Sequence, residues 1–135
     1  YDEVECGHHY ARAMASYGVL LALSGFAADL PNERLRFAPK LNEKDFAGFF
    51  AVDSGWGVYR QKLSCGKSTH DVDVNYGKLR LRRLSLARPA KGSVRVTVGK
   101  KSVPAEVLAE GKGCQVVLKR AATIRPGTPL KVSLG

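Results

Sequence analysis

The chain has 135 residues, of which 44% are hydrophobic, and its formal net charge is +10. This size and composition permit one domain with a buried core and do not fit a disordered chain. No apolar run reaches the length of a membrane span, no signal peptide is visible, and three widely spaced cysteines exclude a disulfide framework.

The first predicted element is a helix over residues 8–24, where Ala, Met, Leu and Arg dominate and proline is absent. Gly25 follows at the position of a C-terminal cap. Nearly every side chain of this helix is apolar or small, which is typical of a helix buried among other helices. No second helix of this kind is evident, and Tyr1 begins the chain in the middle of a motif. We therefore expect the chain to be a piece of a larger protein.

One face of this helix is polar. Offsets of three and four residues place Glu5, His9, Arg12 and Ser16 on a single stripe. One interpretation is a core network, in which buried charged groups pair with each other. The other is the wall of a ligand pocket, where Arg12 and a glutamate hold hydroxyl groups or an anion. The residue pattern alone favours the core network.

Cys6, His8 and His9 suggest a metal site at the start of the helix. However, the sequence contains no second pair of ligands at metal-binding spacing, and adjacent helical residues project about 100° apart. We therefore predict neither a metal site nor a cofactor.

After the helix, short strands with alternating apolar and polar residues follow one another. They recur at intervals of about ten residues, with turn sequences between them, a pattern typical of an antiparallel sandwich or barrel. Arg125, Pro126, Gly127 and Thr128 have the order of a type II turn. The predicted strands cover residues 35–37, 46–52, 57–63, 70–74, 78–86, 94–98, 102–108, 114–119 and 130–134.

Trp56 is the only tryptophan and lies between Gly55 and Gly57. We expect it to anchor the core, where the glycines let another backbone come close. The alternative is an exposed platform on which a sugar ring stacks.

The charge is unevenly distributed along the chain. Residues 1–45 hold five Lys/Arg and seven Asp/Glu, a net charge of −2, whereas residues 46–135 hold seventeen and five, a net charge of +12. A basic half raises the possibility of nucleic acid as a partner. The basic residues alternate with apolar ones, as on the solvated face of a strand, and no Phe, Trp or Tyr that could stack on bases follows Tyr76. We therefore predict no nucleic-acid binding.

Together these patterns predict an α+β fold, with one buried N-terminal helix followed by an antiparallel β-sandwich of roughly eight strands. Residues 1–45 would form the helix and its connection, and residues 46–135 would form the sandwich.

The sequence also resembles a known family. The string YDEVECGHHYARAMASYGVLLALSGF, followed by LRFAP and SGWGVYRQ, is similar to the C-terminal part of the catalytic region of glycoside hydrolase family 116. This family contains bacterial β-glucosidases and non-lysosomal glucosylceramidases. The likeness runs from Tyr1 to about Gln61, and residues 62–135 resemble the β-rich tail of bacterial members more loosely. It departs at His8 and Tyr17, and at Val58-Tyr59-Arg60, where Thr-Phe-Ser is more usual.

The resemblance implies a piece of an (α/α)6-barrel enzyme that retains the anomeric configuration. The family's glutamate nucleophile and aspartate acid/base lie upstream of the matched region, so this chain should contain no catalytic residue. Glu3 and Arg12 match the glutamate and arginine that hold glucose hydroxyls, and Glu5 and His9 share the helical stripe of Arg12. The implied ligand is a β-linked glucoside, bound by the intact enzyme.

Two functions follow. The chain is part of a retaining β-glycosidase and supplies sugar-binding residues, or it is a non-catalytic β-sandwich module that binds carbohydrate or a protein partner. In either case the apolar helix is expected to need a partner, and the isolated chain is expected to self-associate through it.

Overall fold

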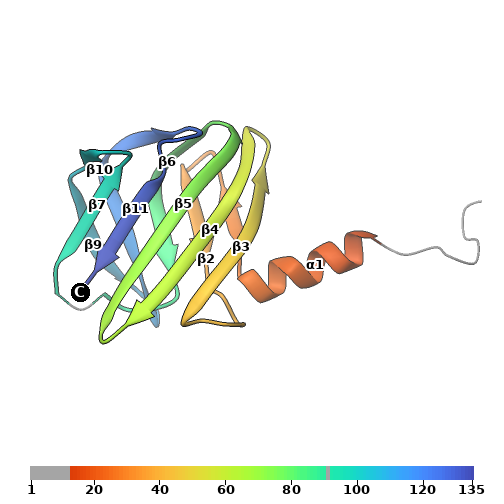
Figure 1. The fold of residues 1–135 in the computed structure, drawn as a ribbon, viewed down its shortest axis with the longest axis horizontal. Helices are drawn as coiled ribbons and strands as arrows, with labels where there is room; N and C mark the ends of the chain where they lie inside the picture. Colours follow the sequence, from red (N-terminus) through yellow and green to blue (C-terminus); the bar gives the residue numbers. More distant parts are fainter. Residues whose placement is uncertain (1–12, 91) are drawn as a thin grey trace, which may run out of the picture.

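A computed structural model describes residues 13–90 and 92–135, with side chains described from residue 15 onward. Within this part, one helix is followed by strands to the end of the chain (Figure 1). The elements are α1 (Ala13–Ser24), β1 (Ala27–Asp29), β2 (Arg34–Phe37), β3 (Asp45–Val52), β4 (Gly55–Ser64), β5 (Lys67–Gly77), β6 (Leu79–Leu86), β7 (Val94–Val98), β8 (Lys101–Ser102), β9 (Ala105–Glu110), β10 (Gly113–Ile124) and β11 (Leu130–Leu134).

The strands form two sheets that pack face to face (Figure 1). The first sheet has the order β1-β2-β6-β10-β9, and the second has the order β3-β4-β5-β11-β7-β8. Neighbouring strands are antiparallel except β2 and β6, which pair in parallel. The predicted α+β class and sandwich are confirmed, although the described part of the chain has eleven strands instead of about eight.

The prediction of one continuous strand over residues 102–108 was wrong. Residues 101–102 form β8 in the second sheet, whereas residues 105–110 form β9 in the first. Pro104 lies between them and has no N–H to donate to a sheet, so the ladder breaks where the chain crosses between sheets.

The predicted boundary after residue 45 does not coincide with an edge of the sandwich. Strands β1 and β2 precede this boundary, yet they belong to the first sheet. Arg34 pairs with Arg83 and Phe37 pairs with Leu86. The sandwich therefore includes residues that the sequence pattern assigned to a connection.

The core fills the space between the sheets. Phe37 of β2 stacks on Tyr59 of β4 across this space, with ring centroids 3.9 Å apart and an interplanar angle of 4°. Phe50 meets the edge of Phe37 with a centroid distance of 5.8 Å. Valine, leucine and isoleucine side chains of both sheets complete the core, including Val72, Leu84 and Ile124.

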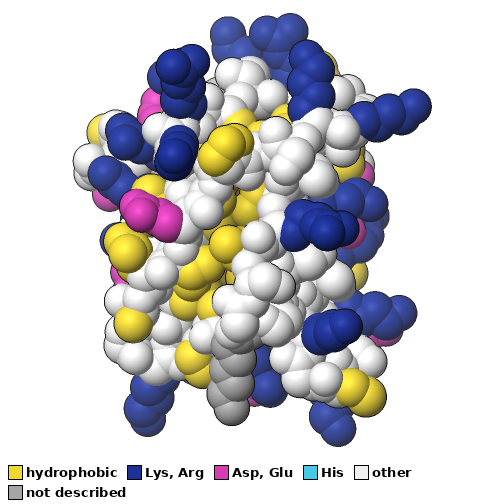
Figure 2. Space-filling model, turned by 90° about the vertical axis from the view of Figure 1, so that its left-hand side faces the viewer, with side chains coloured by type: hydrophobic (Ala, Val, Ile, Leu, Met, Phe, Trp, Pro, Cys, Tyr) yellow, Lys and Arg dark blue, Asp and Glu magenta, His cyan; other side chains and the backbone are white. Residues whose placement is uncertain are grey.

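At one edge of the sandwich the sheets leave part of this core visible. Figure 2 shows a strip of hydrophobic side chains there, flanked by Lys and Arg. Strands β7, β8 and β9 are the outer strands at this edge, and their partly buried core-facing side chains include Val94, Val98 and Val107.

Helix α1 leaves the opposite edge and extends away from the sandwich (Figure 1). The prediction of a buried helix is wrong for this structure, because residues 15–19 and Leu23 are exposed. The C-terminal end of the helix is fixed to the sandwich: Ala38 and Lys40 donate backbone hydrogen bonds of 3.1 and 2.8 Å to the carbonyls of Ser24 and Leu23. Sequence reasoning found the apolar character, but an apolar helix is buried only where a neighbour covers it.

Gly25 ends the helix, as predicted, with a φ of 58°. A Cβ at this position would lie 2.3 Å from the Ala38 carbonyl oxygen, so both the backbone conformation and the space require glycine.

We predict that Gly25→Ala lowers the free energy of unfolding by more than about 1–2 kcal/mol, the cost of the left-handed conformation alone, because the clash adds to it. Gly18→Ala is the matched control, since nothing lies within 4 Å of its added methyl group. The control should leave stability unchanged or raise it by up to about 1 kcal/mol. Urea denaturation of both variants measures the difference, and equal stabilities would contradict the prediction.

Candidate functional site

The predicted sugar-binding residues Glu3, Glu5, His9 and Arg12 lie outside the described part of the chain. Cys6, His8 and His9, which were considered as metal ligands, also lie outside the described residues. Ser16, the last member of the polar stripe, is exposed on α1. The assignment of the stripe to a sugar pocket therefore stays a prediction.

The described part of α1 presents apolar side chains to solvent. Tyr17 is 41% exposed, Val19 58% and Leu23 40%. These residues are not confined to one side of the helix, so a single flat contact would not cover them all. None of the helices in the described residues combines the length and the apolarity needed to cross a membrane.

A chain of hydrogen bonds runs through the core of the second sheet. Tyr59 Oη donates to Gln61 Oε1 over 3.0 Å, and Gln61 Nε2 donates to the Glu43 carbonyl over 2.8 Å. Because the Tyr59 hydroxyl hydrogen is donated to Gln61, Tyr59 Oη can only accept from His70. His70 Nδ1 therefore carries a hydrogen and donates it to Tyr59 Oη over 2.8 Å. His70 Nε2 then accepts from Ser68 Oγ over 3.0 Å.

Burial keeps the side chains of this hydrogen-bond network neutral. Burial lowers the pKa of His70 from 6.5 to about 4 and raises the pKa of Tyr59 above its ordinary value. Burial likewise raises the pKa of the Cys114 thiol. His70 is 1% exposed and Tyr59 is fully buried, so neither can reach a substrate. The chain fixes the core and does not form an active site.

The depressed pKa of His70 predicts a loss of stability in acid. As the pH falls from 6.5 to 4, the unfolded chain takes up a proton that the folded chain resists, and the free energy of unfolding falls by about 3 kcal/mol. We expect His70→Gln to flatten the stability profile across this window, even if it lowers stability at pH 7. Urea denaturation between pH 7 and pH 4 is the measurement. Parallel profiles of the wild-type protein and the variant would contradict the assignment.

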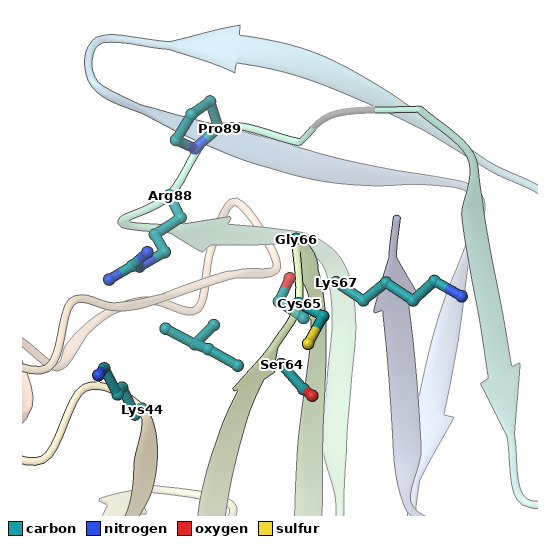
Figure 3. Close-up of a pocket in the computed structure, with 9 residues that line it drawn as sticks. Lys44, Ser64, Cys65, Gly66, Lys67, Arg88 and Pro89 are labelled. Atoms are coloured by element: carbon teal, nitrogen blue, oxygen red, sulfur yellow. The ribbon is translucent and has the colours of Figure 1, made fainter.

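A pocket of about 430 Å³ lies at the turn between β4 and β5 (Figure 3). Cys65 and Gly66 form this two-residue turn with φ values of 44° and 81°, the type I′ geometry that hairpins favour. Lys44 and Arg88 border the pocket on one side, whereas the Lys67 side chain points away from them (Figure 3). Within the described residues no three metal-ligating side chains gather, here or elsewhere. The pocket lacks a paired acid and base.

The outer face of the first sheet carries a basic groove of about 470 Å³. Arg34 is held there by Glu110, over 2.5 Å, and by Ser85 Oγ, over 3.1 Å. Ser85 also accepts from Gln115 Nε2 over 3.3 Å, so these side chains cover its hydroxyl. The remaining basic side chains that line this groove are Arg36, Lys40 and Lys112.

The outer face of the second sheet carries three exposed aromatic rings on adjacent strands. Phe49 of β3 is 40% exposed, Trp56 of β4 43% and Tyr76 of β5 67%. Trp56 lies directly opposite Tyr76, because the pairing of β4 with β5 shifts by one residue next to Trp56. The Phe49 and Trp56 rings contact each other, with centroids 6.1 Å apart and planes tilted by 41°.

The prediction that Trp56 anchors the core was therefore wrong, although the close approach expected at its glycines is present. A Cβ on Gly57 would lie 1.9 Å from the Asp73 carbonyl oxygen, and one on Gly55 would lie 2.3 Å from the Tyr76 carbonyl oxygen. Gly57 is buried and faces the core, so the alternation of the strand turns Trp56 outward. The phase of this alternation was the signal in the sequence that could have placed Trp56 on the surface.

Charged groups adjoin the aromatic rings. Phe49, Val58 and Asp73 lie side by side on β3, β4 and β5, in the row of paired residues next to the one that holds Trp56 and Tyr76. The Arg60 guanidinium lies 3.7 Å from the Asp73 carboxylate. The described outer surface of β3, β4 and β5 thus combines aromatic rings with hydrogen-bonding groups. We call Phe49, Trp56 and Tyr76 the aromatic face.

No family model matches the chain, and no curated protein matches it.

Proposed function

We propose that this chain is part of a retaining β-glycosidase that resembles glycoside hydrolase family 116. In this proposal, Glu3 and Arg12 hold the sugar in the intact enzyme, and the β-sandwich takes no part in the chemistry. The observation that carries the proposal is the exposed apolar surface of α1, which matches the expectation that this helix belongs to a larger helical layer.

The helix supports the proposal through its attachment as well as its composition. Among the described residues, the carbonyls of Leu23 and Ser24 are bound by the segment after β2, and the side chains of Tyr17, Val19 and Leu23 stay at least 40% exposed, so a neighbour can cover these side chains. Burying an exposed Val or Leu side chain contributes about 1.5–3 kcal/mol. A layer of helices around α1 would bury apolar side chains on several sides at once.

The described residues offer no alternative active site. Retaining hydrolysis needs two carboxyl groups about 5–5.5 Å apart, one of them free to protonate the leaving group. Asp29, Glu43, Asp45 and Glu110 line grooves in the described region. Glu43, Asp45 and Glu110 have the basic partners Arg88, Lys62 and Arg34, and the Asp29 carboxylate accepts hydrogen bonds from Asn32. The chemistry is therefore assigned to residues that the resemblance places upstream.

The test of the sugar pocket is Arg12→Ala in the intact enzyme. Removing a guanidinium that binds sugar hydroxyls leaves those hydroxyls without a partner, at a cost of about 1–3 kcal/mol. We expect kcat/KM for an aryl β-glucoside to fall by about tenfold or more, with an unchanged thermal transition. Arg36→Ala, on the outer face of the first sheet, is the matched control and should keep wild-type kinetics. Wild-type kinetics in Arg12→Ala would refute the assignment.

The same surface of α1 predicts self-association of the isolated chain. A second copy would cover Val19 and Leu23, which lie on one side of the helix, where the helical layer is missing. We expect light scattering to show a dimer or larger species at micromolar concentration, and the double variant Val19→Lys, Leu23→Lys to be a monomer.

Leu108→Lys is the control for this experiment, because Leu108 is 48% exposed on β9 in the first sheet, away from the helix. It should associate as the wild-type chain does. A monomeric wild-type chain in which α1 stays protected from hydrogen exchange would contradict the prediction.

The second candidate function, a module that binds carbohydrate without hydrolysing it, is favoured by the aromatic face. Its solvent-exposed rings are not used by the core, and the two functions are compatible within one enzyme.

A further inference from the structure

We propose that the aromatic face, formed by Phe49, Trp56 and Tyr76, is a binding site for a neutral saccharide chain, separate from the sugar pocket predicted at Glu3 and Arg12. The choice of β-linked glucose as its first ligand rests on the proposed function, but the existence of the site does not.

The first argument is the exposure of three aromatic rings on neighbouring strands. Single exposed apolar side chains are normal, but adjacent ones that the core does not use mark a binding surface. Trp56 lies directly opposite Tyr76, and Phe49 touches Trp56. Because neighbouring strands lie about 4.8 Å apart, rings on three strands cover about 10 Å, which is comparable to a disaccharide.

The second argument is the chemistry of the rings. The face of an aromatic ring carries partial negative charge, and the C–H groups on the face of a β-glucose ring carry partial positive charge. A pyranose can therefore lie over Trp56 or Tyr76 while its equatorial hydroxyls point sideways. Asp73 and Arg60 occupy the next two outward rows of the same face along the strands from Trp56, and their carboxylate and guanidinium lie 3.7 Å apart, both accessible to solvent. A carboxylate accepts and a guanidinium donates, so the two together match the mixed character of sugar hydroxyls.

The third argument is the balance of charge on this surface. The outward positions of β3, β4 and β5 carry equal numbers of basic and acidic side chains, namely Arg60, Lys62 and Lys67 with Asp45, Asp71 and Asp73. The chain as a whole has a net charge of +10, and much of the excess lies elsewhere, including Arg34, Arg36, Arg80 and Lys112. A polyanion such as single-stranded nucleic acid would bind where basic residues accompany aromatic rings. The aromatic face lacks this excess, so a neutral ligand fits it better.

The site is also rigid enough to bind with little loss of entropy. Trp56 lies on a strand that is paired on both sides, by β3 and by β5. The backbone of β5 lies so close to Gly55 and Gly57 that neither glycine has room for a Cβ. This close approach fixes the position of Tyr76 relative to Trp56. A platform on a rigid scaffold loses less freedom when a ligand binds than a loop does.

Trp56 is the only tryptophan of the chain, so its fluorescence reports directly on the site. We would titrate the full 135-residue chain with a tetrasaccharide of β-1,4-linked glucose and follow the emission of Trp56. The expected result is a saturable change in emission. In Tyr76→Ala, which keeps the reporter, the midpoint should move to a concentration about tenfold higher or more.

Trp56→Ala should abolish binding of the same tetrasaccharide in isothermal titration calorimetry, with an unchanged thermal transition because Trp56 is exposed. Tyr17→Ala is the matched control, an exposed aromatic ring on α1, and should bind as the wild-type chain does. Saccharide binding that survives Trp56→Ala would overturn the proposal, as would absence of both heat and fluorescence change up to millimolar ligand.

Two other outcomes would replace the saccharide with a different partner and so overturn the proposal. One is quenching of Trp56 by a single-stranded oligonucleotide with no response to the saccharide. The other is a dimer in light scattering that Trp56→Ala disperses. The titration does not involve hydrolysis, so its failure leaves the predicted glycone pocket untouched. Wild-type kinetics in Arg12→Ala would likewise leave the aromatic face untouched.

Discussion

The stack of Phe37 on Tyr59 is the contact on which the rest of the molecule depends. It joins the last residue of β2 in one sheet to the middle of β4 in the other, with nearly parallel rings. Tyr59 cannot shift without breaking its hydrogen bonds to Gln61 and His70, so the stack fixes β2 as well. The residues directly after Phe37 are those that hold the end of α1. The aromatic stack therefore contributes, with the ladders of β2 to β1 and β6, to the direction in which the helix leaves the sandwich.

The two outer faces of the sandwich have different chemistry, although both belong to strands of similar pattern. The face of the first sheet is basic and polar, with side chains such as Arg34 and Gln115 bound to Ser85. The face of the second sheet is balanced in charge and aromatic around Trp56. Since the inner faces of both sheets are used by the core, any binding function of the sandwich has to reside on these outer faces, at its edges or in its turns. The basic face of the first sheet suits an anionic partner, whereas the charge-balanced face of the second sheet suits a neutral one.

Local patterns in the sequence predicted most of the strands and the end of the helix. Alternating residues marked β6, β7 and β11, and Gly25 marked a backbone conformation that other residues avoid. Long-range features were out of reach: nothing near Arg34 indicates its parallel pairing with Arg83. Trp56 was misplaced because its neighbouring glycines suggested burial, whereas the pleat decides the side on which each residue lies. The sugar pocket could be predicted only through Glu3 and Arg12 in a recognisable motif, since spacing alone favoured a plain core network.

The parallel pairing of β2 with β6 also orders the events of folding. Residues 34–37 of β2 pair with residues 83–86 of β6. When β2 leaves the ribosome, β6 has therefore not yet been synthesised. A hairpin such as β4–β5 can close at once, whereas contacts of this range are slow to form. Until β6 arrives, Leu35 and Phe37 are exposed beside an apolar helix, a combination that invites association with other nascent chains. The segment that ties α1 to the sandwich is thus exposed to such association until β6 has been made.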